Sequence, residues 1–142
     1  MAKTAKRQIG DQGEEVACKY LVGKGYRVLE RNYLKPWGEI DIVAERPARA
    51  GGAKKLYFVE VKTVSRESAS WQIHPERLVR GRYRPEENMH PAKLRRLHRA
   101  VQTYLMDRKV PESKEWQIDL ACVYLDLATH KAKVEVLENV IL

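Results

Sequence analysis

Apolar and charged residues alternate most clearly in residues 39–45 and 56–64. Both segments have a period of two, which is the period of a β-strand with one face buried. Residues 46–53 between them contain a proline and two adjacent glycines, which are typical of a hairpin loop. The pattern therefore predicts two antiparallel strands joined by a loop.

The other periodic segments predict two helices and three further strands. These segments are residues 8–24 and 91–109 for the helices and residues 26–34, 116–127 and 133–142 for the strands. Residues 65–90 contain prolines, several arginines and few periodic apolar positions, so we predict a long, mobile loop there. The order α-β-β-β-α-β-β predicts a single α/β domain over residues 1–142, with a mixed β-sheet flanked by helices.

Positive charge is concentrated in residues 66–109. The formal net charge is +8, and residues 66–109 hold eleven Lys or Arg against five Asp or Glu. Clustered cations attract a polyanion whatever its sequence, although a solvated face that only aids solubility has the same composition. Charge alone leaves both interpretations open.

Composition indicates a soluble, cytoplasmic protein. No apolar run approaches the roughly 20 residues needed to cross a bilayer, and the basic N-terminus lacks the apolar segment of a signal peptide. Cys18 and Cys122 have no metal-ligand spacing and fall in apolar segments, so we expect reduced, buried thiols.

Charged residues on the two alternating strands form a candidate catalytic site. A symmetric hairpin would place Asp41 opposite Glu60 and Glu39 opposite Lys62, with Glu39 and Asp41 on one face. Facing residues have Cβ atoms roughly 5 Å apart, so two carboxylates could bind one hard cation such as Mg²⁺ or Mn²⁺. Lys62 beside such an ion would act on the attacking water. The alternative is a set of solvated charges on an exposed sheet, but the apolar neighbours favour central strands, where charges are costly unless paired or bound to metal.

Glu14 on the first helix is a weaker candidate. It follows Gly10 and Gly13, whose lack of side chains would let the helix pack closely against another backbone. A carboxylate there could add a metal ligand, but the residues alone favour an ordinary surface glutamate.

Several motifs together resemble those of the YraN-like bacterial family. The motifs are Gly10-x-x-Gly13-Glu14-x-x-Ala17, Gly25-Tyr26, Arg31-Asn32, Gly38-Glu39-Ile40-Asp41-Ile42-Val43-Ala44 and Phe58-Val59-Glu60-Val61-Lys62-Thr63. The match is dense over residues 10–63 and resumes at 91–105 and 118–120. The family is placed among the restriction-endonuclease-like PD-(D/E)xK nucleases, close to the Holliday-junction resolvases. The resemblance thus implies a restriction-endonuclease-like fold and metal-dependent endonuclease activity.

The resemblance also assigns roles to individual residues of the acidic site. It makes Asp41 and Glu60 the metal carboxylates and Lys62 the catalytic lysine. Glu14 resembles the helical acidic residue that resolvase-type members add to the metal site. Glu39 fits the family motif as a residue that supports the metal ligands.

Basic residues would contact the nucleic acid. By the resemblance, Lys93 matches a position that could hold a phosphate. The family usually has arginine where this chain has Val64, and Arg66 has the same strand parity and could replace it. A later motif, Arg-Phe-Asp in the family, is Gln117-Ile118-Asp119 here. The nucleic-acid-binding candidates are Arg66, Lys93, Arg95, Arg96 and Arg99.

Three functions are compatible with these observations. The first is a metal-dependent nuclease that acts on branched or structured DNA, and the second is a nucleic-acid-binding module with a weak or silent site. The third is a structural protein, which the concentrated basic charge opposes. Intact Asp41, Glu60 and Lys62 favour the first, because a silent site would free these positions to drift. We expect nucleic acid as the partner, DNA rather than RNA, no membrane, and a homodimer if the protein resolves four-way junctions.

Overall fold

The computed structural model describes residues 4–47, 52–66 and 91–140. It contains two helices and five strands, which confirms the predicted order and the mixed α/β fold class. The elements are α1 (Ala5–Gly23), β1 (Arg27–Lys35), β2 (Gly38–Pro47), β3 (Lys54–Arg66), α3 (Pro91–Asp107), β4 (Trp116–Asp126) and β5 (Lys131–Leu137). The single domain over residues 1–142 stays a prediction.

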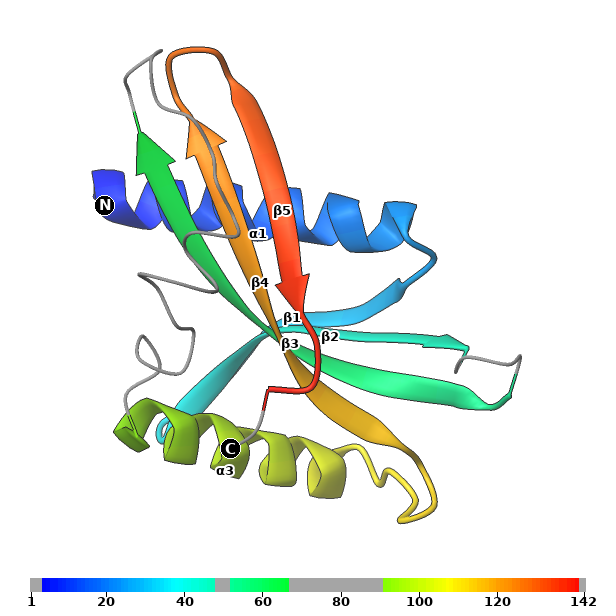
Figure 1. Ribbon diagram of the computed structural model, residues 1–142. Coiled ribbons are helices and arrows are strands. Elements are labelled where there is room, and N and C mark those ends of the chain that lie inside the picture. The colour runs from blue at the N-terminus through cyan, green and yellow to red at the C-terminus, as the bar shows by residue number, and fades with distance from the viewer. Residues whose placement is uncertain (1–3, 48–51, 67–90, 141–142) are drawn as a thin grey trace.

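The five strands form one twisted sheet in the order β1-β2-β3-β4-β5 (Figure 1). β3 and β4 are parallel, and the other neighbouring pairs are antiparallel. Two parallel neighbours need a crossover connection, since a short turn can join only antiparallel strands. α3 lies on this crossover, which is why a helix follows the third strand.

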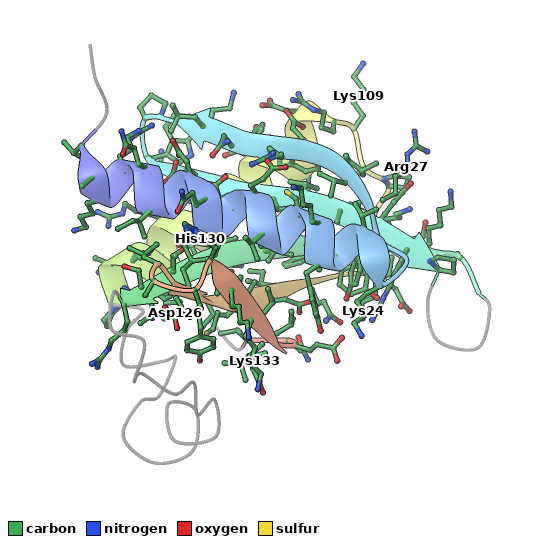
Figure 2. All side chains as sticks on the ribbon, turned by 90° about the horizontal axis from the view of Figure 1, so that it is seen from above. Lys24, Arg27, Lys109, Asp126, His130 and Lys133 are labelled. Carbon is green, nitrogen blue, oxygen red and sulfur yellow. The ribbon has the colours of Figure 1, made fainter. Side chains whose placement is uncertain are left out.

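The two helices cover opposite faces of the sheet, α1 in the upper part and α3 in the lower part of Figure 1, and Figure 2 shows α1 lying across the sheet from above. α1 lies over a core that includes Leu21 and Val59, whereas α3 covers a core that includes Phe58 and Val101. Consecutive residues Phe58 and Val59 thus enter different cores, as the alternation along a strand requires. This arrangement makes β3 a central strand with both faces covered.

Glycines allow close contact between the helices and the sheet at two points. A Cβ on Gly13 would lie 1.8 Å from the Thr63 Oγ1 atom, so α1 can approach β3 only because this residue has no side chain. Likewise, a Cβ on Gly38 would lie 2.5 Å from the Arg96 carbonyl oxygen of α3. The prediction that Gly13 allows close packing of the helix is confirmed, although its neighbour is a side chain and not a backbone. The same prediction for Gly10 is wrong, because no atom lies within 4 Å of the position of its Cβ.

Several element boundaries differ from the sequence predictions. β3 continues to Arg66, so residues 65 and 66 belong to a strand, and the rest of the predicted 65–90 loop lies outside the described residues. α1 begins at Ala5, where the Thr4 side chain accepts a hydrogen bond from the Arg7 N–H. Its first residues are exposed and carry no apolar period, which is why the pattern placed the start too late. No helix in the described part of the chain is long and apolar enough to cross a bilayer.

Candidate active site

The candidate site lies where β2 and β3 separate. Their backbone pairing runs from Pro47 and Lys54 to Ile42 and Val59. One further step in this register puts Asp41 opposite Glu60, as the symmetric hairpin predicted. At this step the Asp41 Oδ2 atom accepts a hydrogen bond of 2.8 Å from the Val61 N–H. The Asp41 side chain therefore takes the place of a backbone acceptor where the backbone pairing of the two strands ends. The predicted pairing of Glu39 with Lys62 lies beyond the paired residues.

The period of two is broken on β2 beside Asp41. Ile40 packs into the core under α3, whereas Ile42 packs into the core under α1. Asn32, which the register places opposite Asp41 on β1, has a φ of 53°. The alternation that predicted Glu39 and Asp41 on one face therefore does not apply here. On both strands, the side chains before and after this point are directed to the opposite faces from those that a regular alternation would give.

Asp41 and Glu60 form a buried carboxylate pair. Their exposed fractions are 8% and 7%, respectively. Burial raises the pKa of Asp41 to about 8, and the negative charge of Glu60 contributes, against a lowering hydrogen bond from Val61. Burial and the charge of Glu60 both disfavour the charged form of Asp41. The pair is stabilised by anything that supplies positive charge between the two groups, either a proton or a cation.

Lys93 in the first turn of α3 contacts this pair. Its Nζ atom lies 2.9 Å from the Glu60 Oε1 atom. Burial lowers the pKa of Lys93, but the hydrogen bond to Glu60 and the charges of Glu60 and Asp41 raise it, and the net shift is upward. Sequence reasoning placed Lys93 on a phosphate and did not predict its contact with Glu60.

Glu14 lies near the pair without completing a metal site. Its negative charge contributes to the raised pKa of Asp41. The pKa of Glu14 is itself raised, mainly by burial, while the charge of Arg31 opposes the shift. Within the described residues, however, no three His, Cys, Asp or Glu side chains are grouped closely enough to hold a metal ion. The predicted set of Asp41, Glu60 and Glu14 is therefore not assembled as a three-ligand site.

The donor atoms still fit a hard cation held by two carboxylates. Mg²⁺ keeps several waters and binds through one or two carboxylates, so Asp41 and Glu60 suffice. The Glu14 Oε1 atom is buried without a hydrogen-bond partner. Such an atom is well suited to accept a hydrogen bond from a metal-bound water.

Lys62 is exposed and lies on β3 two residues after Glu60. It pairs in register with Cys122 of β4, and Cys122 belongs to the core under α3. Glu60 and Lys62 thus share the α3 face of β3, as the alternation predicted. Glu39 is exposed at the start of β2, and its charge contributes to the raised pKa of Asp41.

Only some of the predicted nucleic-acid-binding residues lie together. Lys93 and Arg96 line a cleft of about 390 Å³ that also reaches Glu60. The Arg99 guanidinium lies 4.7 Å from the ring centroid of Trp37, which lines the same cleft.

The other two candidates lie elsewhere. Arg95 lines a different cavity, together with Leu94, His98 and Arg99, so Arg99 lies between this cavity and the ring of Trp37; Arg66 lies at the end of β3. Sequence reasoning missed Trp37, although a tryptophan in the turn directly before Gly38 and the acidic motif was a usable signal.

Comparison with known proteins identifies the family. The model of the uncharacterised protein family UPF0102 matches residues 13–123. The chain belongs to family UPF0102. This is the YraN family, so the resemblance seen in the motifs is confirmed. All the candidate residues of the acidic site lie within the matched range.

Relatives in family UPF0102 match most of the chain. A UPF0102 protein of Campylobacter lari is 31% identical over 131 residues, which cover 92% of this chain and 91% of the relative. One from Moorella thermoacetica is 33% identical over 134 residues, covering 94% and 95%. One from Thermotoga maritima is 35% identical over 99 residues, covering 70% and 72%. The family assignment therefore does not depend on a short motif.

Proposed function

We propose that this UPF0102 protein is a nuclease that uses Mg²⁺ or Mn²⁺ to hydrolyse phosphodiester bonds in branched or structured DNA. The observation that carries the proposal is the buried pair of Asp41 and Glu60 at the point where β2 and β3 separate. A buried pair of carboxylates is unfavourable in a fold unless it binds a proton or a cation. Lys62 on the same face of β3 supplies the third group that this chemistry needs.

Each residue has a definite task in this proposal. Asp41 and Glu60 would hold the cation, which polarises the phosphate and makes water a better nucleophile. Lys93 donates to the Glu60 Oε1 atom and so fixes the orientation of that carboxylate. The exposed ammonium of Lys62 would orient the attacking water and stabilise negative charge on the phosphate oxygens in the transition state.

Positive side chains near the site would hold the DNA backbone. Arg96 and Lys93 line the cleft that begins at Glu60, and Lys35 adds a third cation. Phosphates are attracted to such a surface whatever the base sequence, so this part of the binding would weaken steeply with salt.

A nucleic-acid-binding module with a silent site is the second candidate. Lys93 already neutralises Glu60, and Asp41 has a pKa of about 8, so near neutral pH the pair is compensated by one lysine and one proton. The charge of the pair is therefore compensated without a bound cation, as a module that only binds nucleic acid would require.

A cleavage panel tests the two candidates. Linear duplex, single strand, flap and four-way junction would each be incubated with Mg²⁺, Mn²⁺ or a chelator. We expect metal-dependent cleavage of at least one structured substrate. Lys62→Ala should lower the rate by about 100-fold and change DNA affinity by less than about threefold, because the lysine acts mainly in the transition state.

Lys54→Ala is the matched control, since this lysine lies at the opposite end of β3 and is exposed. It should cleave like the wild type. If the protein binds DNA but cuts nothing with either metal, the silent module replaces the nuclease.

Resolution of a four-way junction would also require two active sites, so that activity implies a homodimer. Sedimentation at micromolar concentration, with and without junction DNA, measures the assembly. A monomer in both conditions would exclude symmetric resolution and favour cleavage of flaps or single strands.

A further inference from the structure

The cleft beside Glu60 joins an aromatic surface to the candidate active site. It is lined by residues 34–39 of the β1–β2 turn, by Glu60, and by Lys93, Arg96 and Leu97 of α3, with a volume of about 390 Å³. Glu60 belongs to both the cleft and the carboxylate pair, and Lys93 lines the cleft and pairs with Glu60. A ligand in the cleft would therefore lie beside a phosphate held at the carboxylates.

The tryptophan of the turn is fixed by α3. The Trp37 Nε1 atom donates a hydrogen bond of 3.3 Å to the Thr103 Oγ1 atom, and the Arg99 guanidinium lies 4.7 Å from the ring centroid. The close packing of Gly38 on the Arg96 carbonyl holds the turn against the same helix. Trp37 is thus a rigid side chain, and little entropy is lost when a ligand packs against it.

The chemistry of the cleft combines apolar and cationic groups. Leu34 lies in the lining with 70% of its surface exposed, next to the half-buried Trp37. Lys35 and Arg96 lie beside them in the same lining, and the Lys35 Nζ atom also pairs with the Asp107 Oδ2 atom at 3.2 Å. A flat apolar ring attached to phosphates has matching chemistry, which describes a nucleotide whose base is not paired. A base inside a duplex is stacked on both sides and cannot offer its face to a side chain.

We propose that the cleft binds an unpaired base next to the phosphate that is cleaved, so that the substrate has a single-stranded nucleotide at the cleavage point. The inference rests on the proposed nuclease function and specifies its substrate class. Trp37 and Leu34 contact the base, and Arg96 and Lys35 contact the flanking phosphates. Flaps, single strands and opened branch points meet this requirement, whereas a continuous duplex does not.

Binding measurements in a chelator test the inference without relying on cleavage. A flap DNA would carry the fluorescent base 2-aminopurine at its first unpaired position, and a duplex would carry it at a paired position. We expect wild-type protein to bind the flap about tenfold more tightly than the duplex and to change the emission of the unpaired probe only. Trp37→Ala should weaken flap binding by about tenfold, change duplex binding by less than about twofold and abolish the change in emission.

Conservative and control variants sharpen the test. Trp37→Phe keeps an aromatic face and should retain most of the preference for the flap. Leu34→Ala changes an exposed side chain, so it should fold normally and lower flap affinity by about threefold. Tyr20→Ala removes a partly exposed aromatic ring from α1, on the opposite face of the sheet, and should leave both affinities unchanged.

Two results would overturn the inference. The first result is that Trp37→Ala weakens flap and duplex binding equally while Leu34→Ala binds both normally. Trp37 would then stabilise the fold and would not contact a base. Unchanged flap binding in both variants would show that the cleft holds no base. If the protein gives either result and still cleaves DNA, the nuclease proposal is retained and the base subsite is rejected. Flap binding that depends on Trp37 in a protein that cuts nothing would support the subsite and remove the nuclease.

Discussion

Replacing Asp41 by asparagine should stabilise the protein at neutral and alkaline pH while removing the metal site. Asparagine has nearly the same shape, and its side-chain oxygen can still accept the hydrogen bond from the Val61 N–H. The substitution removes the charge that is unfavourable beside Glu60. A residue kept for function at the expense of stability should behave in this way.

The magnitude follows from the pKa of Asp41. Below about pH 4, Asp41 carries its proton in both the folded and the unfolded chain. Between the ordinary value of 3.8 and about 8, only the folded chain carries it, so each rise in pH favours unfolding. This contribution lowers the free energy of unfolding by about 1.4 kcal/mol per pH unit, and it levels off above pH 8.

Asparagine cannot lose a proton, so Asp41→Asn should lack this slope. Its neutral oxygen makes a weaker hydrogen bond to Val61 than a carboxylate does, at a cost of about 1 kcal/mol. We therefore expect a gain of about 4 kcal/mol at pH 8 and no gain at pH 4.5.

Urea denaturation at pH 4.5, 6 and 8 in a chelator measures the difference. Glu39→Gln is the matched control, because Glu39 is an exposed neighbouring carboxyl group and its removal should leave the slope nearly unchanged. Added Mn²⁺ should raise the melting temperature of the wild type and of Glu39→Gln, but not of Asp41→Asn, since a ligand that binds only the folded state stabilises it. A stability difference that does not vary with pH, or a less stable Asp41→Asn at pH 8, would refute the reasoning.

Three further predictions concern the surroundings of the site. Gly13→Ala should lower the free energy of unfolding by about 2 kcal/mol or more, because its Cβ would lie 1.8 Å from a side-chain atom of β3, whereas Gly10→Ala should raise it by up to about 1 kcal/mol in the same urea titration. Arg96→Ala should weaken DNA binding at low salt more than Arg95→Ala, because only Arg96 lines the cleft that reaches Glu60; equal losses would place the DNA elsewhere. Lys93→Met removes the cation that pairs with Glu60, so calorimetric titration with Mn²⁺ should show binding that begins at a higher pH than in the wild type, and an unchanged pH dependence would contradict that electrostatic role.

Local patterns were sufficient to predict the strands and the central acidic pair. The alternation on β3 is regular because both of its faces are covered, and the symmetry of the hairpin predicts Asp41 opposite Glu60, one step beyond the last backbone pair. The same reasoning failed at Ile40 and Ile42, where the strand changes its facing. That change involves Asn32 on the neighbouring strand, so a pattern within β2 alone could not show it.

Contacts between distant segments were beyond the reach of local patterns. The pairing of Lys93 with Glu60 depends on where α3 crosses the sheet, and this position is set partly by the packing of Gly38 on Arg96. The cleft around Trp37 arises from the same crossing. Sequence spacing gives no measure of such an approach, because the two segments are far apart along the chain.

The hydrogen bond from Val61 to Asp41 affects how sequences of family UPF0102 should be interpreted. Loss of the side-chain acceptor would leave a partly buried N–H of a central strand without this partner, so selection for folding alone would keep Asp or Asn at this position. Glu60 is similarly tied to Lys93. A hydrogen-bond acceptor that persists at this position is therefore poor evidence that relatives are enzymes, whereas an aspartate kept in place of the more stable asparagine is evidence of function. Lys62 is exposed and is the better diagnostic, because a lineage that abandoned catalysis would lose that lysine first.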